Sequence, residues 1–271
     1  MNHTVFPLPR RTKWKIAVHG RPLELEKPGR SCEYGLVVLK VELHSHTADD
    51  PLDRIPYSTR DLIDRAAALD YDALAVTLHD RQLDLRPLET YAMERGIALI
   101  PGIERTVQGR HVLLLNFEHG AEDVQTFEDV RRLKQQGAGL VVAPHPFFPA
   151  GMSLLGCMNR YPDLFDAVEC NAMYTSSLNF NRLAERWARR HGKPMVGNGD
   201  VHRMEQLGTT YSLVDAEPNA SAICAAIAAG RVTVVSRPIS WAAAARVMSS
   251  LYWTKYFEGE SRTAQPSHVP A

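Results

Sequence analysis

The stretch VELHSHTADDPLD, residues 41–53, places two histidines and three aspartates where an apolar run ends. The run, GLVVLKVEL over residues 35–43, is typical of a buried strand. Residues two apart on a strand point to the same side, so His44 and His46 share one face. Taken alone, the stretch fits either a charged surface turn or one wall of a metal site. The rest of the chain decides between these interpretations.

Composition indicates an ordinary globular protein. The chain has 271 residues, which suits one large domain, and α/β barrels often have about this length. Lysine plus arginine equals aspartate plus glutamate, 31 against 31, and this balance argues against nucleic-acid binding through bulk charge. The four cysteines form no CxxC pair, and we find neither a signal peptide nor a membrane-spanning run. We expect a cytoplasmic protein with no membrane partner, and homo-oligomer formation stays open.

Strand-like and helix-like segments alternate between residues 35 and 257. The predicted strands cover 35–43, 73–77, 98–102, 111–117, 139–145, 167–171, 194–198, 209–215 and 231–236. The predicted helices cover 58–69, 85–95, 124–136, 181–191, 220–229 and 240–257, and Ser58 and Asp61 are spaced as a capping box. Short apolar strands between helices predict a parallel sheet, and this many units favour a barrel. We expect an α/β barrel over 35–257, an extension over 1–34 and a disordered tail over 258–271.

Histidines and acids follow the carboxyl ends of most predicted strands. They are His44, His46, His79, Asp80, Glu104, His145, Asp200 and His202, while Glu169 lies within a strand. In a barrel these ends meet at one face, so the residues would share one pocket. His111 is an exception, because it opens its strand. A single histidine is more often a hydrogen-bonded core residue, but the spacings His-x-His and Asp-x-His favour a metal site. Imidazole and carboxylate ligands suit zinc, manganese or iron.

Seven motifs resemble, in order, those of the PHP (polymerase and histidinol phosphatase) family. They are VELHSHT, LAVTLHD, PGIE, HVLLL, VVAPHP, VECN and GNGDVH, between about residues 40 and 205. The resemblance implies a distorted, TIM-like (β/α)7 barrel with two or three divalent ions at its carboxyl face. It also implies an enzyme, a hydrolase that cleaves phosphate esters.

The resemblance assigns metal ligands in three groups. They are His44, His46, Glu104 and Asp200 at a first ion, His79 and His202 at a second, and His111 and His145 at a third that Glu104 bridges. A further ligand is expected shortly after the second histidine. We favour Asp50, with Asp49 next and Asp53, interpreted as a surface residue, third.

Three residues depart from the family pattern without removing a ligand. Glu42 replaces an aspartate, Leu78 replaces another aspartate before His79, and Gly199 replaces a serine. The loss of an acid at Leu78 removes a carboxylate that could support a ligand.

The leading functional hypothesis is a phosphomonoesterase acting on a small phosphorylated metabolite or nucleotide. Metal-activated hydroxide would attack phosphorus, with Asp200 or His202 managing protons. Arg105 and Arg203 are candidates for binding the phosphate. The alternatives are a nuclease, which the neutral charge argues against, and a metal-binding module without catalysis.

Overall fold

The computed structural model describes residues 13–18, 21–26 and 38–257. The chain divides into two units, Met1–Val38 and Leu39–Ala271. In the first, β1 (Lys13–Val18) and β2 (Arg21–Glu26) form an antiparallel pair within the expected extension. The predicted disordered tail, 258–271, lies outside the described residues.

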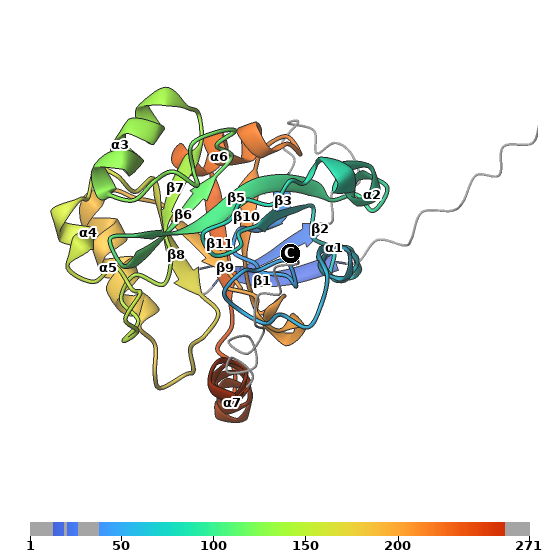
Figure 1. The fold of residues 1–271 in the computed structure, drawn as a ribbon. Coiled ribbons are helices and arrows are strands. Elements are labelled where there is room, and N and C mark those ends of the chain that lie inside the picture. Colours follow the sequence, from blue (N-terminus) through green and yellow to red (C-terminus); the bar gives the residue numbers. More distant parts are fainter. Residues whose placement is uncertain (1–12, 19–20, 27–37, 258–271) are drawn as a thin grey trace, which may run out of the picture. The chain divides into compact units, whose positions relative to one another are not determined.

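In the described part of the second unit, nine strands form one sheet that curls into a nearly closed barrel (Figure 1). The strands are β3 (Val38–Glu42), β4 (Ala73–Val76), β5 (Ala98–Val107), β6 (Arg110–Leu115), β7 (Leu140–Ala143), β8 (Ala167–Asn171), β9 (Met195–Asn198), β10 (Thr210–Asp215) and β11 (Val232–Ser236). Their order across the sheet is β11-β10-β3-β4-β5-β6-β7-β8-β9. The prediction of a distorted α/β barrel is confirmed.

The sheet is mixed, so the prediction of a parallel sheet is wrong in two places. Strand β6 runs antiparallel to both β5 and β7, and β11 runs antiparallel to β10. The turn between β5 and β6 consists of Gln108 and Gly109, with φ values of 48° and 76°. Two consecutive positive φ values suit a two-residue hairpin, which joins neighbouring antiparallel strands without a crossover helix.

The barrel closes where β9 approaches β10. The Gly197 amide donates to Ser212 Oγ over 2.9 Å, and this hydroxyl donates back to the Gly197 carbonyl over 3.1 Å. A Cβ atom at position 197 would lie 2.6 Å from the carbonyl oxygen of Tyr211. Only glycine therefore permits this close approach of the two strands.

Helices cover the outside of the sheet (Figure 1). The covering helices are α1 (Thr59–Ala68), α2 (Glu89–Met93), α3 (Phe127–Gln136), α4 (Cys157–Arg160), α5 (Asn181–His191) and α6 (Ala220–Ala228). The described residues also form η1 (Arg86–Leu88), η2 (Met204–Gln206) and α7 (Trp241–Phe257). The predicted capping box of Ser58 and Asp61 is confirmed at the start of α1. One core cluster joins α3, α4 and α5 to β6–β8, and another joins α1 and α2 to β4.

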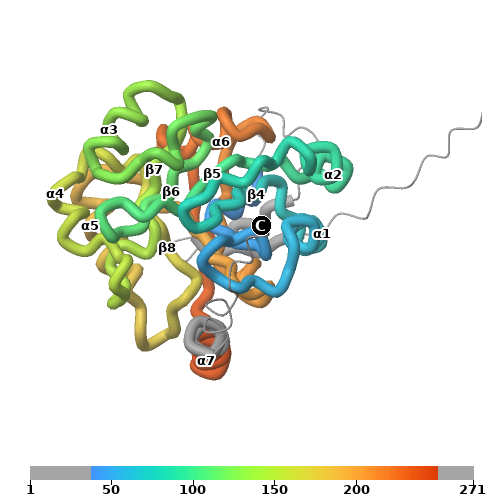
Figure 2. Tube along the Cα trace, viewed as in Figure 1, coloured from blue at the N-terminus to red at the C-terminus, as the bar shows by residue number. Residues whose placement is uncertain are grey.

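The last helix, α7, stands apart from the other helices at the bottom of the view (Figure 1). The loop after β8 runs down beside its start (Figure 2). There the Ile239 amide donates to the Tyr174 carbonyl, and Trp241 Nε1 donates to Ser177 Oγ. Among the helices of the described ranges, none combines the length and hydropathy of a membrane span.

Candidate metal centre

Most predicted ligands lie just beyond the carboxyl ends of parallel strands. His44 and His46 follow β3, and His79 follows β4. Single bridges extend the pairing beyond the regular strands, joining Ser45 to Val201 and His79 to Glu104. These bridges fix the backbone on both sides of the ligands, so the imidazoles project from a rigid edge.

His111 reaches the same edge because β6 runs in the opposite direction. It pairs with Thr106 of β5, so the first residues of β6 lie beside the last residues of β5. Its Nδ1 lies 2.7 Å from Glu104 Oε1. The hairpin at Gln108 and Gly109 thus explains the one histidine that did not follow a predicted strand.

Glu104 lies at the centre of the site, with its side chain 1% exposed. Its two oxygens contact five imidazoles. Oε2 lies 3.1 Å from His44 Nε2, 3.3 Å from His46 Nε2 and 3.2 Å from His79 Nε2, and Oε1 lies 2.7 Å from His111 Nδ1 and 3.0 Å from His145 Nε2. A carboxylate so placed can bridge ions on two sides.

Buried carboxylates hold the imidazoles from behind. Glu169 Oε1 lies 2.8 Å from His44 Nδ1, and Asp50 Oδ2 lies 2.9 Å from His46 Nδ1 and 3.0 Å from His79 Nδ1. The inward Nε2 atoms of His44 and His46 are buried and have no hydrogen-bond partner. A metal-ligating histidine is commonly oriented in this way, with one nitrogen on a carboxylate and the other free for the ion. These residues therefore fit divalent ions.

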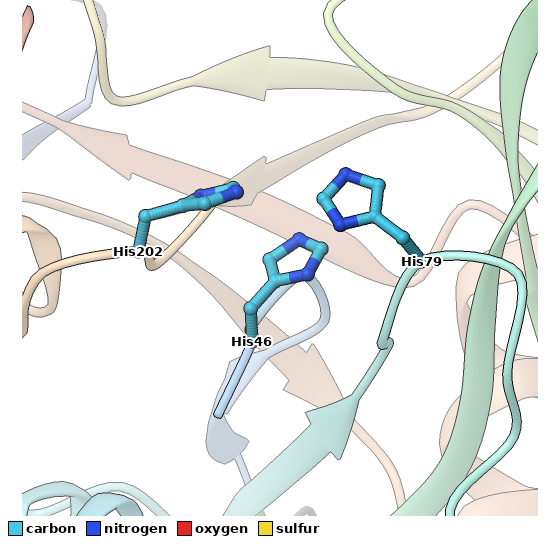
Figure 3. A group of neighbouring side chains, drawn as sticks. All are labelled: His46, His79 and His202. Carbon is cyan, nitrogen blue, oxygen red and sulfur yellow. The ribbon is translucent and has the colours of Figure 1, made fainter. Parts of the chain in front are cut away.

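Four groups of side chains offer ligand atoms that lie within 4.8 Å of one another. They are His46, His79 and His202; His44, His46 and Glu104; His44, His145 and Asp200; and His79, Glu104 and His111. In the first group the three rings face one another (Figure 3). Eight of the nine predicted ligands thus come together, and several belong to two groups. Buried clusters of this kind support more than one metal site.

The three aspartates of the opening stretch differ in burial and in the residues they contact. Asp50 is buried behind His46 and His79 and belongs to none of the four groups. Asp49 is exposed and accepts hydrogen bonds from Thr47 and Thr59. Asp53, expected at the surface, is 39% exposed in its side chain and also contacts the site, with Oδ2 3.1 Å from His202 Nε2.

The two arginines predicted to bind phosphate, Arg105 and Arg203, lie outside the lining of the large cavity. The Arg105 guanidinium donates to Asp80 Oδ1 over 2.8 Å and to the Val124 carbonyl over 2.6 Å. Arg203 lines a smaller hollow, about 150 Å³ in volume, beside Met173. Neither lines the larger cavity into which the ligand groups open.

Several supporting residues were not assigned from the sequence. Asn171 Nδ2 donates to Glu169 Oε2 over 3.2 Å, and Asn198 Nδ2 donates to Glu169 Oε1 over 2.9 Å. The motif VECN supplies Glu169 and Asn171 from β8, so its polar residues in an otherwise apolar strand were the available signal. Burial of a carboxylate requires such partners.

Glu42 supports the site from the other side. It is fully buried and accepts from the amides of Gly199, at 2.9 Å, and His44, at 3.1 Å. A Cβ atom at position 199 would meet Glu42 Oε2 at 3.2 Å. The glutamate at position 42 therefore fits because position 199 is a glycine, which leaves room for the longer side chain. Burial raises the pKa of Glu42 to about 8, against the lowering effect of these two hydrogen bonds.

The cluster carries strong and opposing electrostatic effects. Burial alone would raise the pKa of Glu104, yet the charges of His44 and His111 hold it well below its usual range. Burial would lower the pKa of His202, but hydrogen bonds with Asp200 and Asp53 raise it to about 10. The carboxylates thus attract positive charge, which protons or divalent cations can supply in competition.

Two of the predicted ligands adopt a strained backbone. His145 has a φ of 27° and Asp200 a φ of 49°, both in the left-handed region that side chains disfavour. Such strain costs on the order of 1–3 kcal/mol and collects at functional sites. Both side chains turn toward His44, whose group they complete.

The PHP-associated family model matches residues 179–232, which include α5, β9 and β10. No curated protein matches the chain with significance. Among solved structures, PsfC from Pseudomonas syringae PB-5123 is 18% identical, with 79% of this chain and 97% of PsfC covered at a TM-score of 0.51. The lesion-specific endonuclease Q of Pyrococcus furiosus is 14% identical, with 86% and 73% covered at a TM-score of 0.52.

A third structure, provisionally described as a metal-dependent phosphoesterase of Bifidobacterium adolescentis, is 15% identical, with 60% and 88% covered at a TM-score of 0.45. At these identities the likeness concerns the fold. The family match covers the last of the seven motifs, GNGDVH. Residues 179–232 therefore match the PHP-associated family, and the described residues form a buried histidine–glutamate cluster that could hold divalent ions.

Proposed function

We propose that the protein is a phosphomonoesterase that cleaves a small phosphorylated substrate at a centre of two or three divalent ions. The observation that carries this proposal is the position of Glu104 among five imidazoles, two of which, His44 and His46, have a buried Nε2 atom close to Glu104 Oε2 that forms no hydrogen bond. The four ligand groups would hold divalent ions, which would supply an activated water and charge neutralisation for phosphate-ester cleavage.

The side chains divide the work by position. Glu104 of β5 and the histidines and aspartate of the four ligand groups, from β3, β4, β6, β7 and β9, would together hold the ions. Asp200 and His202 line the cavity beside the cluster, with His202 Nδ1 3.3 Å from Asp200 Oδ1. This pair can pass a proton between the cluster and the leaving group. Asp50 and Glu169 keep the imidazoles oriented through Nδ1.

The proposal is tested by phosphate release from a panel of phosphomonoesters, with manganese, zinc or iron added to metal-stripped protein. We expect turnover that requires the metal and disappears with a chelator. Protein that binds metal stoichiometrically yet releases no phosphate from any ester would refute it, and would favour a metal-binding module without catalysis.

A nuclease is the second candidate, because endonuclease Q shares the fold over most of the chain. Nucleic acid usually requires cationic side chains along its path. None of the described residues that line the cavity is lysine or arginine. We expect no cleavage of single- or double-stranded DNA, and salt-sensitive cleavage that outpaces monoester hydrolysis would reverse this preference.

A further inference from the structure

One cavity of about 580 Å³ opens directly from the ligand groups. Six polar residues form its floor, namely His79, Glu104, His111, His145, Asp200 and His202. A phosphate group alone would fill only a small part of this volume. The rest is the size of a pocket for a small organic molecule.

The opposite side of the cavity is apolar. This wall consists of Phe148 after β7, Tyr174, Leu178 and Phe180 after β8, and Trp241 and Met248 of α7. The rings of Phe148 and Phe180 lie 5.5 Å apart and tilted. The wall combines the loop after β7, the loop after β8 and α7, which lies at the bottom of the view (Figure 2).

Much of the wall is left open by the described residues. Trp241 is 58% exposed, Met248 57% and Leu178 47%. Large apolar side chains gathered at one exposed place, next to a polar site, are typical of ligand recognition. Because they adjoin the floor, their natural occupant is the part of the substrate that does not react.

The few polar groups near the wall already have partners. Thr175 Oγ1 accepts from the Leu178 amide, and the Tyr174 hydroxyl accepts from Ser236. Trp241 Nε1 donates to Ser177 Oγ. The lining includes no lysine or arginine among the described residues. A sugar, a nucleoside or a second phosphate would therefore lose hydrogen bonds or charge pairing on entering.

We propose that the substrate is the phosphate monoester of a hydrophobic alcohol, with an alkyl or aryl body against the wall and its phosphate on the floor. This inference rests on the proposed function for the reaction, and goes beyond it in naming the substrate class. The phosphate dianion would then bind at the metal centre, and the uncharged alkyl or aryl group would pack against the apolar wall.

The test uses full-length, metal-loaded protein and a series of primary-alcohol phosphates, namely ethyl, butyl, hexyl and 2-phenylethyl phosphate. The leaving groups are chemically alike, so differences in kcat/KM report binding of the body. We expect kcat/KM to rise by about four-fold for each methylene that becomes buried. Glycerol 3-phosphate, similar in length to butyl phosphate but hydroxylated, should be the poorer substrate.

Binding of ethylphosphonate and hexylphosphonate, measured by calorimetry, separates this inference from the proposed function. If hexylphosphonate binds more tightly than ethylphosphonate but none of the phosphate esters is hydrolysed, the proposed phosphomonoesterase activity is refuted. The inference that the cavity binds an apolar ligand would then still hold. Turnover or binding that is flat or falls along the series would overturn the inference while leaving the phosphomonoesterase in place.

A matched pair of variants locates the effect. Met248→Ala should reduce the preference for hexyl over ethyl phosphate by about three-fold or more, because it removes apolar contact area from the wall. Met93 is similarly exposed, at 70%, but lies on α2 and does not line the cavity. Met93→Ala should keep the preference of the native protein, and an equal loss in both variants would contradict the assignment of the wall.

Discussion

The floor and the wall of the cavity are built in opposite ways. Floor residues project from strand ends, are largely buried, and have defined partners, as Glu104 does with five imidazoles. Wall residues come from loops and from α7, and Trp241 and Met248 remain more than half exposed. Rigid strands suit groups that must meet ions at fixed distances, whereas loops and a peripheral helix suit variable contacts with a substrate body. Under the proposed function, the residues at the strand ends would carry out the reaction, and the loops together with α7 would select the substrate.

The strongest test of this comparison is Glu104→Gln, which keeps the shape of the side chain and removes its charge. We expect kcat/KM to fall on the order of 10³-fold or more, because the cluster would lose the central carboxylate charge that would help to hold the ions and stabilise the transition state. Metal content should fall as well, as measured by elemental analysis. Glu185→Gln, an exposed change on α5, is the matched control and should retain activity. An active Glu104→Gln variant would mean that the floor is not the reactive part.

Glu169→Gln should have the next largest effect. It weakens the carboxylate that orients His44 through Nδ1 without removing a ligand. Loss of such a support typically costs about 10- to 100-fold in metal affinity or activity. Titration with metal should show a higher Kd at unchanged stoichiometry. A changed stoichiometry would instead identify Glu169 as a ligand.

A third prediction concerns the tight packing of Gly199 against Glu42 and Val201, next to the metal-site residues. Gly199→Ser should destabilise the fold by about 1–3 kcal/mol, because its Cβ would meet Val201 at 2.5 Å and Glu42 at 3.2 Å. The cost should shrink in a Glu42→Asp background, where the shorter acid leaves space. Denaturant unfolding of the single and double variants gives this coupling.

Gly156→Ala is the control for this double-mutant comparison, since a Cβ atom at position 156 meets nothing within 4 Å. Its unfolding free energy should change little. Strictly additive effects of Gly199→Ser and Glu42→Asp would show that the two departures from the family pattern are independent of each other.

The smallest effect on catalysis is expected for Arg105→Gln. The guanidinium is already engaged by Asp80 and the Val124 carbonyl, so KM should change by less than about two-fold. Thermal unfolding should reveal a loss of about 1–3 kcal/mol from the broken charged hydrogen bonds. A large rise in KM with unchanged stability would restore Arg105 as a phosphate-binding residue.

The floor could be predicted from the sequence because strand geometry leaves a visible trace. A strand is readable as an apolar run, and the residue that follows it must lie at the edge of the sheet. His111 did not follow a predicted strand, because it begins a strand that runs in the opposite direction. The dipeptide Gln108-Gly109 before it forms the hairpin turn that reverses the chain. The choice among Asp49, Asp50 and Asp53 depended on loop conformation, which spacing alone does not determine.

The wall could not be predicted, since its residues follow no spacing. Phe148, Leu178 and Met248 are ordinary apolar residues that become a surface only when two loops and α7 come together. Arg105 and Arg203 were chosen for nearness in sequence to Glu104 and His202. In the fold, side chains next to each other on a strand point to opposite sides, which separates Arg105 from the floor.

The most direct test of the central claim is the metal content of the purified native protein and of Glu104→Gln after dialysis against zinc or manganese, read together with phosphate release. We predict two or three ions per native chain, fewer in the variant, and phosphate release that rises with metal occupancy. A native chain that retains less than one ion, or that hydrolyses phosphate esters equally well with and without metal, would contradict the account.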